Sequence, residues 1–246
     1  RLARTGRDFD WAAEIFAAGY RVICPDTIGR GLSSWSANPD ADYTVPVYHD
    51  IALGLLDALG VTTCRWVGTS MGGLIGMAVA AGEAGRGRIA KLVLNDIGPA
   101  LNAEAVNRIK AYVSIVPEFA TMAEFEAFLR AVYAPFGALT DAQWRHLAET
   151  SVRRRDDGKL SSHFDPAVMR VFCDQLDGSE AWEIWETITC PTLLLRGENS
   201  DLVLAETAER MTRTGPKPRL ITVPGCGHAP ALNVPGQVRP VAEFLA

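Results

Sequence analysis

One serine has the flanking residues that nucleophilic catalysis requires. The stretch Gly68-Thr69-Ser70-Met71-Gly72 follows the pattern G-x-S-x-G, which a chain of this length matches by chance roughly one time in ten. An apolar run typical of a strand precedes it, and an apolar run typical of a helix follows it. This context predicts a tight strand-to-helix turn with the hydroxyl at its tip. It favours a nucleophilic serine over an ordinary turn.

The glycines and the helix start would serve the chemistry of that serine. We expect Gly68 and Gly72 to let the strand and the helix approach each other where any Cβ would collide. The first turn of a helix has unpaired N–H groups and a partial positive charge, which can stabilise an oxyanion. The expected reaction is therefore attack on a carbonyl carbon.

A serine hydroxyl needs a base to take its proton, and the chain has four histidines. Three of them, His49, His146 and His163, lie in predicted helices or in the middle of the chain, where a solvated or hydrogen-bonded histidine is expected. His228 lies in a glycine-rich loop directly after a predicted strand. Loops at strand C-termini are where sites form in proteins with parallel sheets, so His228 is the predicted base.

The imidazole needs a carboxylate to hold its tautomer and to stabilise the imidazolium. Three candidates follow strands: Asp96, Glu198 and Asp201. Asp201 is favoured because it lies within a loop rather than at a strand end, and because it gives the chain order Ser–Asp–His. Asp96 is instead expected to fix the backbone where the sheet gives way to the next segment.

Short apolar runs alternate with longer helical patterns, which is typical of βα units on a largely parallel sheet. Each run ends in a turn signal, as expected of strands covered on both faces. The helical pattern near residue 50 ends at Gly60, a plausible C′ residue. The five candidate strands are Tyr20–Asp26, Cys64–Thr69, Lys91–Asp96, Thr192–Gly197 and Pro218–Gly225.

The segment 99–186 breaks this rhythm, because helical patterns follow one another with no convincing strand. We interpret it as a helical cap inserted into a core domain formed by 1–98 and 187–246. Thr140 is a predicted N-cap, and the run RRRDDG (Arg153–Gly158) is expected to be a solvated helix end and turn. The aromatic side chains of the segment could line an apolar pocket, but most of them are expected to pack against the sheet domain; they are Tyr112, Phe119, Phe125, Phe128, Tyr133, Phe136 and Trp144.

The composition narrows the class of protein. A net charge of −5 and a pI near 5.4 argue against nucleic acid or an anionic membrane as the main partner. The five cysteines include no C-x-x-C pair, so we expect reduced, mostly buried thiols in a cytoplasmic protein and no zinc site. No apolar run is long enough for a transmembrane helix. No metal or organic cofactor is expected.

Four motifs in this order resemble those of the α/β-hydrolase family. They are PDTIGRGLSSW (Pro25–Trp35), GTSMGG around Ser70, GENSDLV around Asp201 and GCGHAP around His228. The resemblance covers nearly the whole chain and implies a mostly parallel, eight-stranded sheet with a helical cap after the sixth strand. The opening LARTGRDFDW resembles the segment after the family's His-Gly loop. By that resemblance the first three strands and the His-Gly pair are missing from this sequence, and Arg1 stands where a glycine is expected.

The resemblance also implies residue roles. The backbone N–H groups of Met71 and Leu2 would form the oxyanion hole. Trp35 is expected beside the substrate pocket for a different reason, because its loop also follows the C-terminus of a predicted strand. Family members that open epoxides or remove halides by alkylation have aspartate in place of Ser70, so those activities are excluded.

The expected function is hydrolysis of a small-to-medium carboxylic ester or lactone through an acyl-enzyme on Ser70. Two alternatives remain open. One is a hydrolase of carbon–carbon bonds in ring-fission products, or of enol lactones, since GTSMGG resembles the elbows of such enzymes. The other is a non-catalytic binding protein of the same fold. The expected partner is a small molecule, and the sequence does not indicate an oligomeric state.

Overall fold

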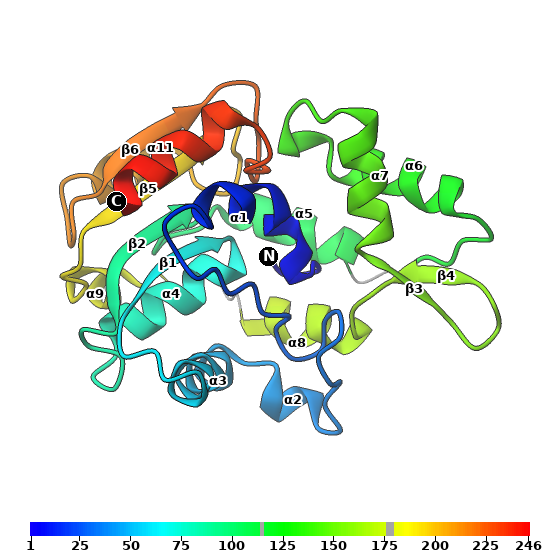
Figure 1. Cartoon of the computed structure of the whole chain (residues 1–246), viewed down its shortest axis with the longest axis horizontal. Helices are drawn as coiled ribbons and strands as arrows, with labels where there is room; N and C mark the ends of the chain where they lie inside the picture. Colours follow the sequence, from blue (N-terminus) through cyan, green and yellow to red (C-terminus); the bar gives the residue numbers. More distant parts are fainter. Residues whose placement is uncertain (114–115, 176–179) are drawn as a thin grey trace.

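Four of the five predicted strands form one parallel sheet. The computed structural model describes residues 1–113, 116–175 and 180–246. The strands pair in the order β1-β2-β5-β6, and every pair is parallel. Figure 1 shows the sheet running through one half of the molecule. The strand bounds are β1 Cys64–Thr69, β2 Ile89–Asn95, β5 Thr192–Gly197 and β6 Arg219–Val223.

The fifth predicted strand, Tyr20–Asp26, is not a strand in the structure. A strand exists through its ladder of backbone hydrogen bonds, and no strand among the described residues pairs with this segment. The side chains of Ile23 and Cys24 are exposed, contrary to the expectation of cover on both faces. Within the described residues the main sheet therefore has four strands, whereas the resemblance implies eight.

Alternating side chains of the sheet bury both of its faces. Leu92 and Leu94 of β2 join one apolar cluster, and Val93 between them joins the other. Helices α1 (Asp10–Phe16) and α11 (Pro235–Leu245) cover the second cluster, in front of the sheet in Figure 1. This is the three-layer arrangement that buried parallel strands require.

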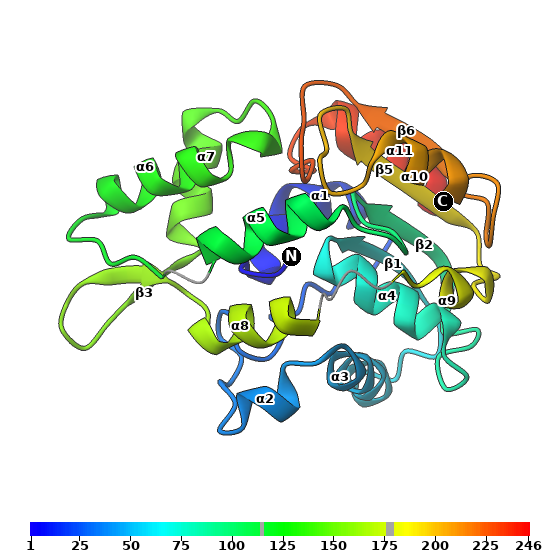
Figure 2. The ribbon, with the colours of Figure 1, turned by 180° about the vertical axis from the view of Figure 1, so that it is seen from behind.

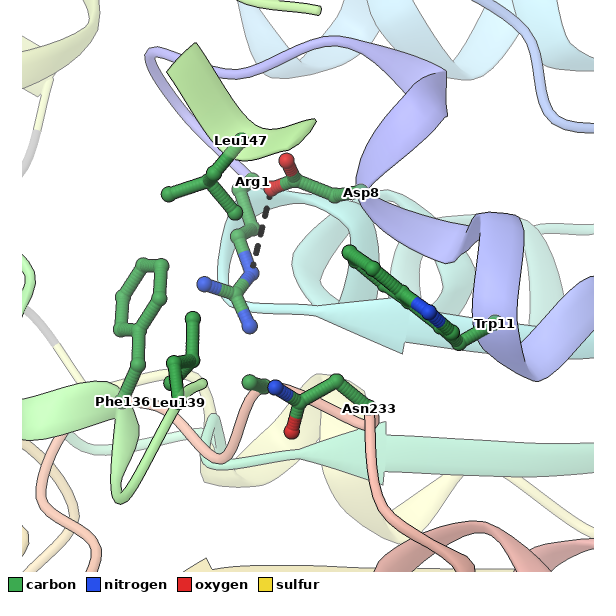
Figure 3. Close-up of a pocket in the computed structure, with 8 residues that line it drawn as sticks. Arg1, Asp8, Trp11, Phe136, Leu139, Leu147 and Asn233 are labelled. Atoms are coloured by element: carbon green, nitrogen blue, oxygen red, sulfur yellow. Dashed lines mark ion pairs between the residues drawn. The ribbon is translucent and has the colours of Figure 1, made fainter. Parts of the chain in front are cut away.

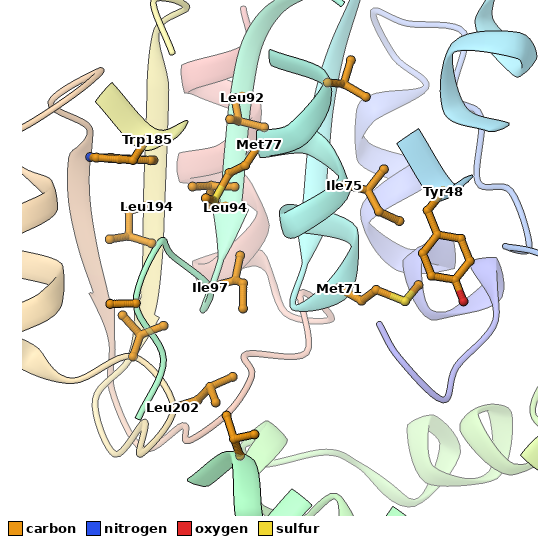
Figure 4. Packing of buried hydrophobic residues seen from close by; sticks show 14 of the residues in the cluster. Tyr48, Met71, Ile75, Met77, Leu92, Leu94, Ile97, Trp185, Leu194 and Leu202 are labelled. Carbon is orange, nitrogen blue, oxygen red and sulfur yellow. The ribbon is translucent and has the colours of Figure 1, made fainter. Parts of the chain in front are cut away.

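The larger cluster lies on the opposite face, which Figure 2 shows from the front. Part of it is drawn in Figure 4, where Tyr48 of α3 (Val45–Ala58) lies beside Met71 of α4 (Met71–Ala81), and Met77 of α4 lies beside Leu92 of β2. Gly60 has the positive φ of the predicted C′ position, and N–H groups of residues 60 and 61 donate to Asp57 and Leu56 as in a Schellman motif. The remaining elements outside 99–180 are η1 Gly6–Phe9, α2 Pro39–Asp42, α9 Trp182–Glu186 and α10 Ala205–Met211.

The segment 99–186 contains one element that the sequence did not predict. Strands β3 and β4 form an antiparallel hairpin, so the helix expected to run through the three arginines ends at Glu149 instead. The turn part of RRRDDG is present, since Gly158 N–H donates to Arg155 O. Thr140 is the N-cap of α7, with a capping box to Gln143. The bounds are α5 Ala103–Val113, α6 Met122–Val132, η2 Ala134–Phe136, α7 Asp141–Glu149, β3 Val152–Arg154, β4 Leu160–Ser162 and α8 Pro166–Gln175.

Part of this segment has its own apolar core. A cluster separate from those of the sheet is formed by Phe125, Leu129, Trp144 and Leu147. In both views, α6, α7 and the β3–β4 hairpin lie to one side of the sheet. The aromatic side chains of this cluster therefore pack against one another, and the expectation that they pack against the sheet domain was wrong for them. The Tyr112 side chain lies outside what the structure describes. Residues of α5 and α8 belong to the main cluster, so the domain boundary at 99–186 remains a prediction. No helix in the described ranges is long and apolar enough to cross a membrane.

Candidate active site

Ser70 lies at the tip of a strained turn between β1 and α4. Its φ of 52° and ψ of −122° are unusual for a residue with a side chain. Its backbone N–H donates to Asn95 O at the end of β2, 3.1 Å away. This hydrogen bond to the neighbouring strand therefore helps to hold the serine in a strained backbone conformation. Such strain is common at functional sites.

The close approach of strand and helix depends on Gly68 and Gly73. A Cβ on Gly68 would lie 2.3 Å from Gly72 O, and a Cβ on Gly73 would lie 2.3 Å from a methyl group of Ile97. The expectation for Gly72 was wrong, because a Cβ there would meet nothing within 4 Å. Only its carbonyl lies against Gly68; its own Cα faces open space.

His228 lies in the loop after β6 and reaches the serine. Its Nε2 is 3.1 Å from Ser70 Oγ. Two contacts from distant segments hold the loop: Gly227 N–H donates to Pro135 O at 2.7 Å, and Asn95 Nδ2 donates to Pro230 O at 2.9 Å. The loop is therefore held at residues on both sides of His228 in the sequence.

The carboxylate beside His228 belongs to Asp96, which directly follows β2. Its Oδ2 lies 2.8 Å from His228 Nδ1, and the residue is completely buried. Oδ2 also accepts from Ser200 Oγ at 2.6 Å, and Oδ1 accepts from Gly197 N–H at 3.0 Å. These donors stabilise a buried charge that would otherwise be costly.

Asp201, the residue favoured from the sequence, does not lie beside the imidazole. Its carboxylate accepts from Nε and Nη2 of Arg108 on α5, at 3.0 and 2.5 Å, and both side chains are about half exposed. Its carbonyl accepts from Asn102. The prediction failed because the loop after β5 turns Ser200 inward and Asp201 outward, whereas Asp96 lies in a bend with a positive φ (56°) directly at the end of β2.

Ser70, His228 and Asp96 thus form a continuous chain of contacts from hydroxyl to imidazole to carboxylate. A carboxylate at Nδ1 favours the tautomer in which Nδ1 carries the proton, leaving the Nε2 lone pair for the serine. Such an arrangement can deprotonate a hydroxyl as it attacks. Burial and the charge of Asp96 raise the pKa of the nearby Cys226 thiol, which keeps it protonated and a poor competing nucleophile.

The comparisons with known proteins agree with this fold. A model of the "Alpha/beta hydrolase family" matches residues 5–241. The chain belongs to the α/β-hydrolase family. The family predicted from the four motifs is therefore confirmed.

Three relatives of this α/β hydrolase illustrate the range of the family. A 3-hydroxybutyrate-oligomer hydrolase of Cupriavidus necator is 39% identical over 99% of this chain and 85% of its own length. A 2-hydroxymuconate semialdehyde hydrolase of Pseudomonas sp. is 29% identical over 86% of this chain and 71% of its own. A solved α/β hydrolase of Novosphingobium aromaticivorans superposes with a TM-score of 0.89 at 31% identity, covering 99% of this chain and 86% of that one.

The two residues expected to form the oxyanion hole lie on segments close to the serine. Met71 is the first residue of α4, where the helix offers no carbonyl to its backbone N–H. Leu2 packs partly buried against the main apolar cluster, to which Met71 belongs, and its carbonyl accepts from Arg30 Nε at 2.8 Å. Their role as donors remains a proposal.

Trp35 lies beside the β3–β4 hairpin of this α/β hydrolase. The Arg153 guanidinium sits 4.4 Å from the centre of its ring, and the residue is partly exposed. Its expected place in a substrate pocket stays a prediction. Two of the other histidines have carboxylate partners of their own: His49 pairs with Asp50, and His146 lies 2.9 Å from Asp10.

A small cavity beside the histidine loop is not the substrate site. It measures about 10 Å³, room for a single water. Figure 3 shows Arg1 and Asp8 facing Phe136 and Asn233 across it. Neither Ser70 nor His228 lines it. Its lining residues are Arg1, Asp8, Trp11, Phe136, Leu139, Leu147, Ala231 and Asn233.

Sequence reasoning missed Asn95 and Ser200, which form hydrogen bonds to the histidine loop and to Asp96, respectively. Asn95 is fully buried and donates to both Thr69 Oγ1 and Pro230 O. It therefore ties the serine turn to the histidine loop. A signal was present, because a polar residue at the end of the apolar run KLVL is costly to bury unless it is hydrogen-bonded.

Proposed function

We propose that the protein hydrolyses carboxylic esters through an acyl-enzyme on Ser70. The observation that carries this proposal is the chain of contacts Ser70 Oγ–His228 Nε2 at 3.1 Å and His228 Nδ1–Asp96 Oδ2 at 2.8 Å. His228 takes the serine proton as Oγ bonds to the ester carbonyl carbon, and Asp96 stabilises the imidazolium.

The remaining steps return the enzyme to its starting state. The tetrahedral oxyanion accepts hydrogen bonds from the backbone N–H groups of Met71 and Leu2. The carbon–oxygen bond to the leaving alcohol breaks, and His228 gives that oxygen its proton. Water then attacks the acyl-enzyme, with His228 as base again, and releases the acid and free Ser70. No step requires a metal or an organic cofactor.

We propose esters of 3-hydroxy acids as the first substrates to test. The relative named as a 3-hydroxybutyrate-oligomer hydrolase matches this chain along almost its whole length at 39% identity. In such an oligomer the carboxyl group of one unit is esterified by the hydroxyl group of the next, so each cleavage is the reaction described above. Lactones carry the same acyl–oxygen bond and belong in the same panel.

The decisive experiment compares wild type with Ser70→Ala and with Ser34→Ala, which changes an exposed serine. The substrates are p-nitrophenyl butyrate, linear 3-hydroxybutyrate dimer and trimer, a lactone and an aromatic ring-fission product. A fluorophosphonate probe reports on the nucleophile. We expect wild type and Ser34→Ala to cleave the esters and to bind the probe covalently, and Ser70→Ala to do neither.

The same panel separates the alternative functions. Turnover of the ring-fission product with little ester cleavage would replace the ester proposal with carbon–carbon bond hydrolysis. Folded wild-type protein that neither turns over a substrate nor reacts with the probe would indicate a binding protein. Full activity of Ser70→Ala would refute the mechanism altogether.

A further inference from the structure

Arg30, in the loop between Pro25 and Trp35, is completely buried although its side chain carries a charge. Burial lowers its pKa. Among the described residues, the groups that accept hydrogen bonds from the Arg30 guanidinium are neutral: two carbonyls, a phenol and a thioether. Burying a guanidinium is expensive, and apolar side chains of similar volume would often stabilise such a position as well or better. The position therefore calls for an explanation beyond packing.

The guanidinium joins segments that are distant in the chain. Its Nε donates to Leu2 O at 2.8 Å, and its Nη2 lies 3.1 Å from Met71 Sδ. Its Nη1 donates to Ile28 O and to Tyr48 Oη, both at 2.7 Å. Figure 4 shows the Met71 side chain extending toward the ring of Tyr48. The planar guanidinium of Arg30 thus contacts both residues whose N–H groups would donate hydrogen bonds to the oxyanion.

The loop fixes Arg30 before any substrate arrives. Gly31 N–H donates to His163 O at 2.9 Å, and Asp26 accepts from the N–H groups of Leu32 and Gly6. Gly31 has a positive φ, and a Cβ there would lie 2.2 Å from Asp26 Oδ2. Because the guanidinium fork is rigid, a fixed loop transmits a fixed geometry to Leu2 and Met71.

We propose that Arg30 is a positioning residue of the oxyanion hole, holding Leu2 and Met71 at the separation that a tetrahedral oxyanion requires. The inference rests on the proposed acyl transfer at Ser70. In Leu2 the bonded carbonyl and the donor N–H share one Cα, so anchoring the carbonyl restricts the direction of the N–H. In Met71 the anchored side chain restrains the first residue of α4. Preorganised donors are the main source of rate enhancement in such sites.

The test compares Arg30→Lys with Tyr43→Phe as a matched control. The Tyr43 hydroxyl is also buried; it donates to Asp165 and accepts from Ser36 N–H, and neither hydrogen bond involves Arg30. Lysine keeps the charge, but it lacks the planar set of N–H donors with which the guanidinium contacts both Leu2 and Met71. We expect Arg30→Lys to lower kcat for p-nitrophenyl butyrate by about tenfold or more with KM changed less than about threefold. The rate of fluorophosphonate labelling should fall by a similar factor, since that reaction also builds charge in the hole.

A purely structural role predicts another result. Arg30→Lys would then lower Tm, but kcat per titrated active site would equal that of wild type or would fall equally in Tyr43→Phe. Either result overturns the proposal. If Arg30→Lys does not fold, Met71→Leu serves instead, because it removes the sulfur acceptor while nearly conserving volume. We expect it to lower kcat and the labelling rate with little change in Tm; unchanged rates overturn the proposal.

This failure is distinguishable from failure of the proposed function. If Ser70→Ala abolishes activity while Arg30→Lys and Met71→Leu keep normal kcat, acyl transfer at Ser70 stands and only the role of Arg30 is wrong. If Ser70→Ala retains activity, the oxyanion hole has no nucleophile to serve, and both proposals are refuted.

Discussion

The carboxylate of Asp96 lies 2.8 Å from Nδ1 of His228, although 132 positions of the chain separate the two residues. Both follow strands of the same sheet, and carboxyl ends of parallel strands meet at one edge. Asp201 also follows a strand of this sheet, but its carboxylate forms an ion pair with Arg108. The structure therefore places Asp96 beside the imidazole, whereas the sequence favoured Asp201.

Replacing each carboxylate by its amide tests this distinction. We expect Asp96→Asn to lower kcat/KM for p-nitrophenyl butyrate by about 10³–10⁴-fold, because an amide no longer favours the productive tautomer. Asp201→Asn should change it by less than about threefold, since an exposed ion pair contributes little. Steady-state kinetics on both variants provides the measurement. The reverse order of effects would return the role to Asp201.

Asn95 should matter for both stability and rate. Asn95→Ala removes the donor to Thr69 Oγ1 and Pro230 O and leaves buried acceptors without it, which costs about 1–3 kcal/mol of unfolding free energy. It also loosens the loop that holds His228, so kcat should fall. Urea unfolding and kinetics are measured beside Asn102→Ala, whose side chain is only partly buried. Equal losses in the two variants would contradict the assigned role.

The two glycines flanking Ser70 should respond oppositely to alanine. Gly68→Ala places a methyl group 2.3 Å from Gly72 O, so we expect a loss of stability and of probe labelling. Gly72→Ala meets open space inside a helix, where alanine is favoured by up to about 1 kcal/mol. Thermal unfolding of both variants checks this. Similar destabilisation by both would show that the turn tolerates no Cβ on either side.

Asp8 should make stability depend on pH in the acid range. Burial alone would raise its pKa, but the charges of Arg4 and Arg1 outweigh burial and lower it below the ordinary 3.8. The resulting stabilisation is fully present above about pH 3.8 and is lost as the pH falls through the folded-state pKa. Asp8→Asn leaves the buried Arg4 without its carboxylate, a loss of about 3–5 kcal/mol at pH 7.

The measurement is the unfolding free energy of wild type and Asp8→Asn at pH 7 and at several values below 4. The gap between the two proteins should narrow as the pH falls. Asp201→Asn, which breaks an exposed pair, serves as the control with a small gap throughout. A gap that stays constant below pH 4 would show that Asp8 does not titrate with folding.

The sequence by itself determined the fold family and pointed to two residues of the candidate site, Ser70 and His228. Apolar runs bounded by turn residues located four strands, because burial on both faces leaves a strong local pattern. Ser70 was recognisable from its glycines and from the strand and helix around it, and His228 from its glycine-rich loop. These patterns are local, so the residues next to each strand, to Ser70 and to His228 in the sequence were enough for the prediction.

Only the tertiary structure decided which carboxylate faces His228, which glycine the turn requires and what Arg30 contacts. The first and the last depend on segments far apart in the chain: Gly197 and Ser200 donate to Asp96, and Leu2 and Met71 contact one guanidinium. The second depends on the close approach of β1 and α4, which brings the Gly72 carbonyl against Gly68. The unpaired segment Tyr20–Asp26 and the β3–β4 hairpin follow the same rule. A strand is defined by its partner, and the residues of the strand do not specify that partner.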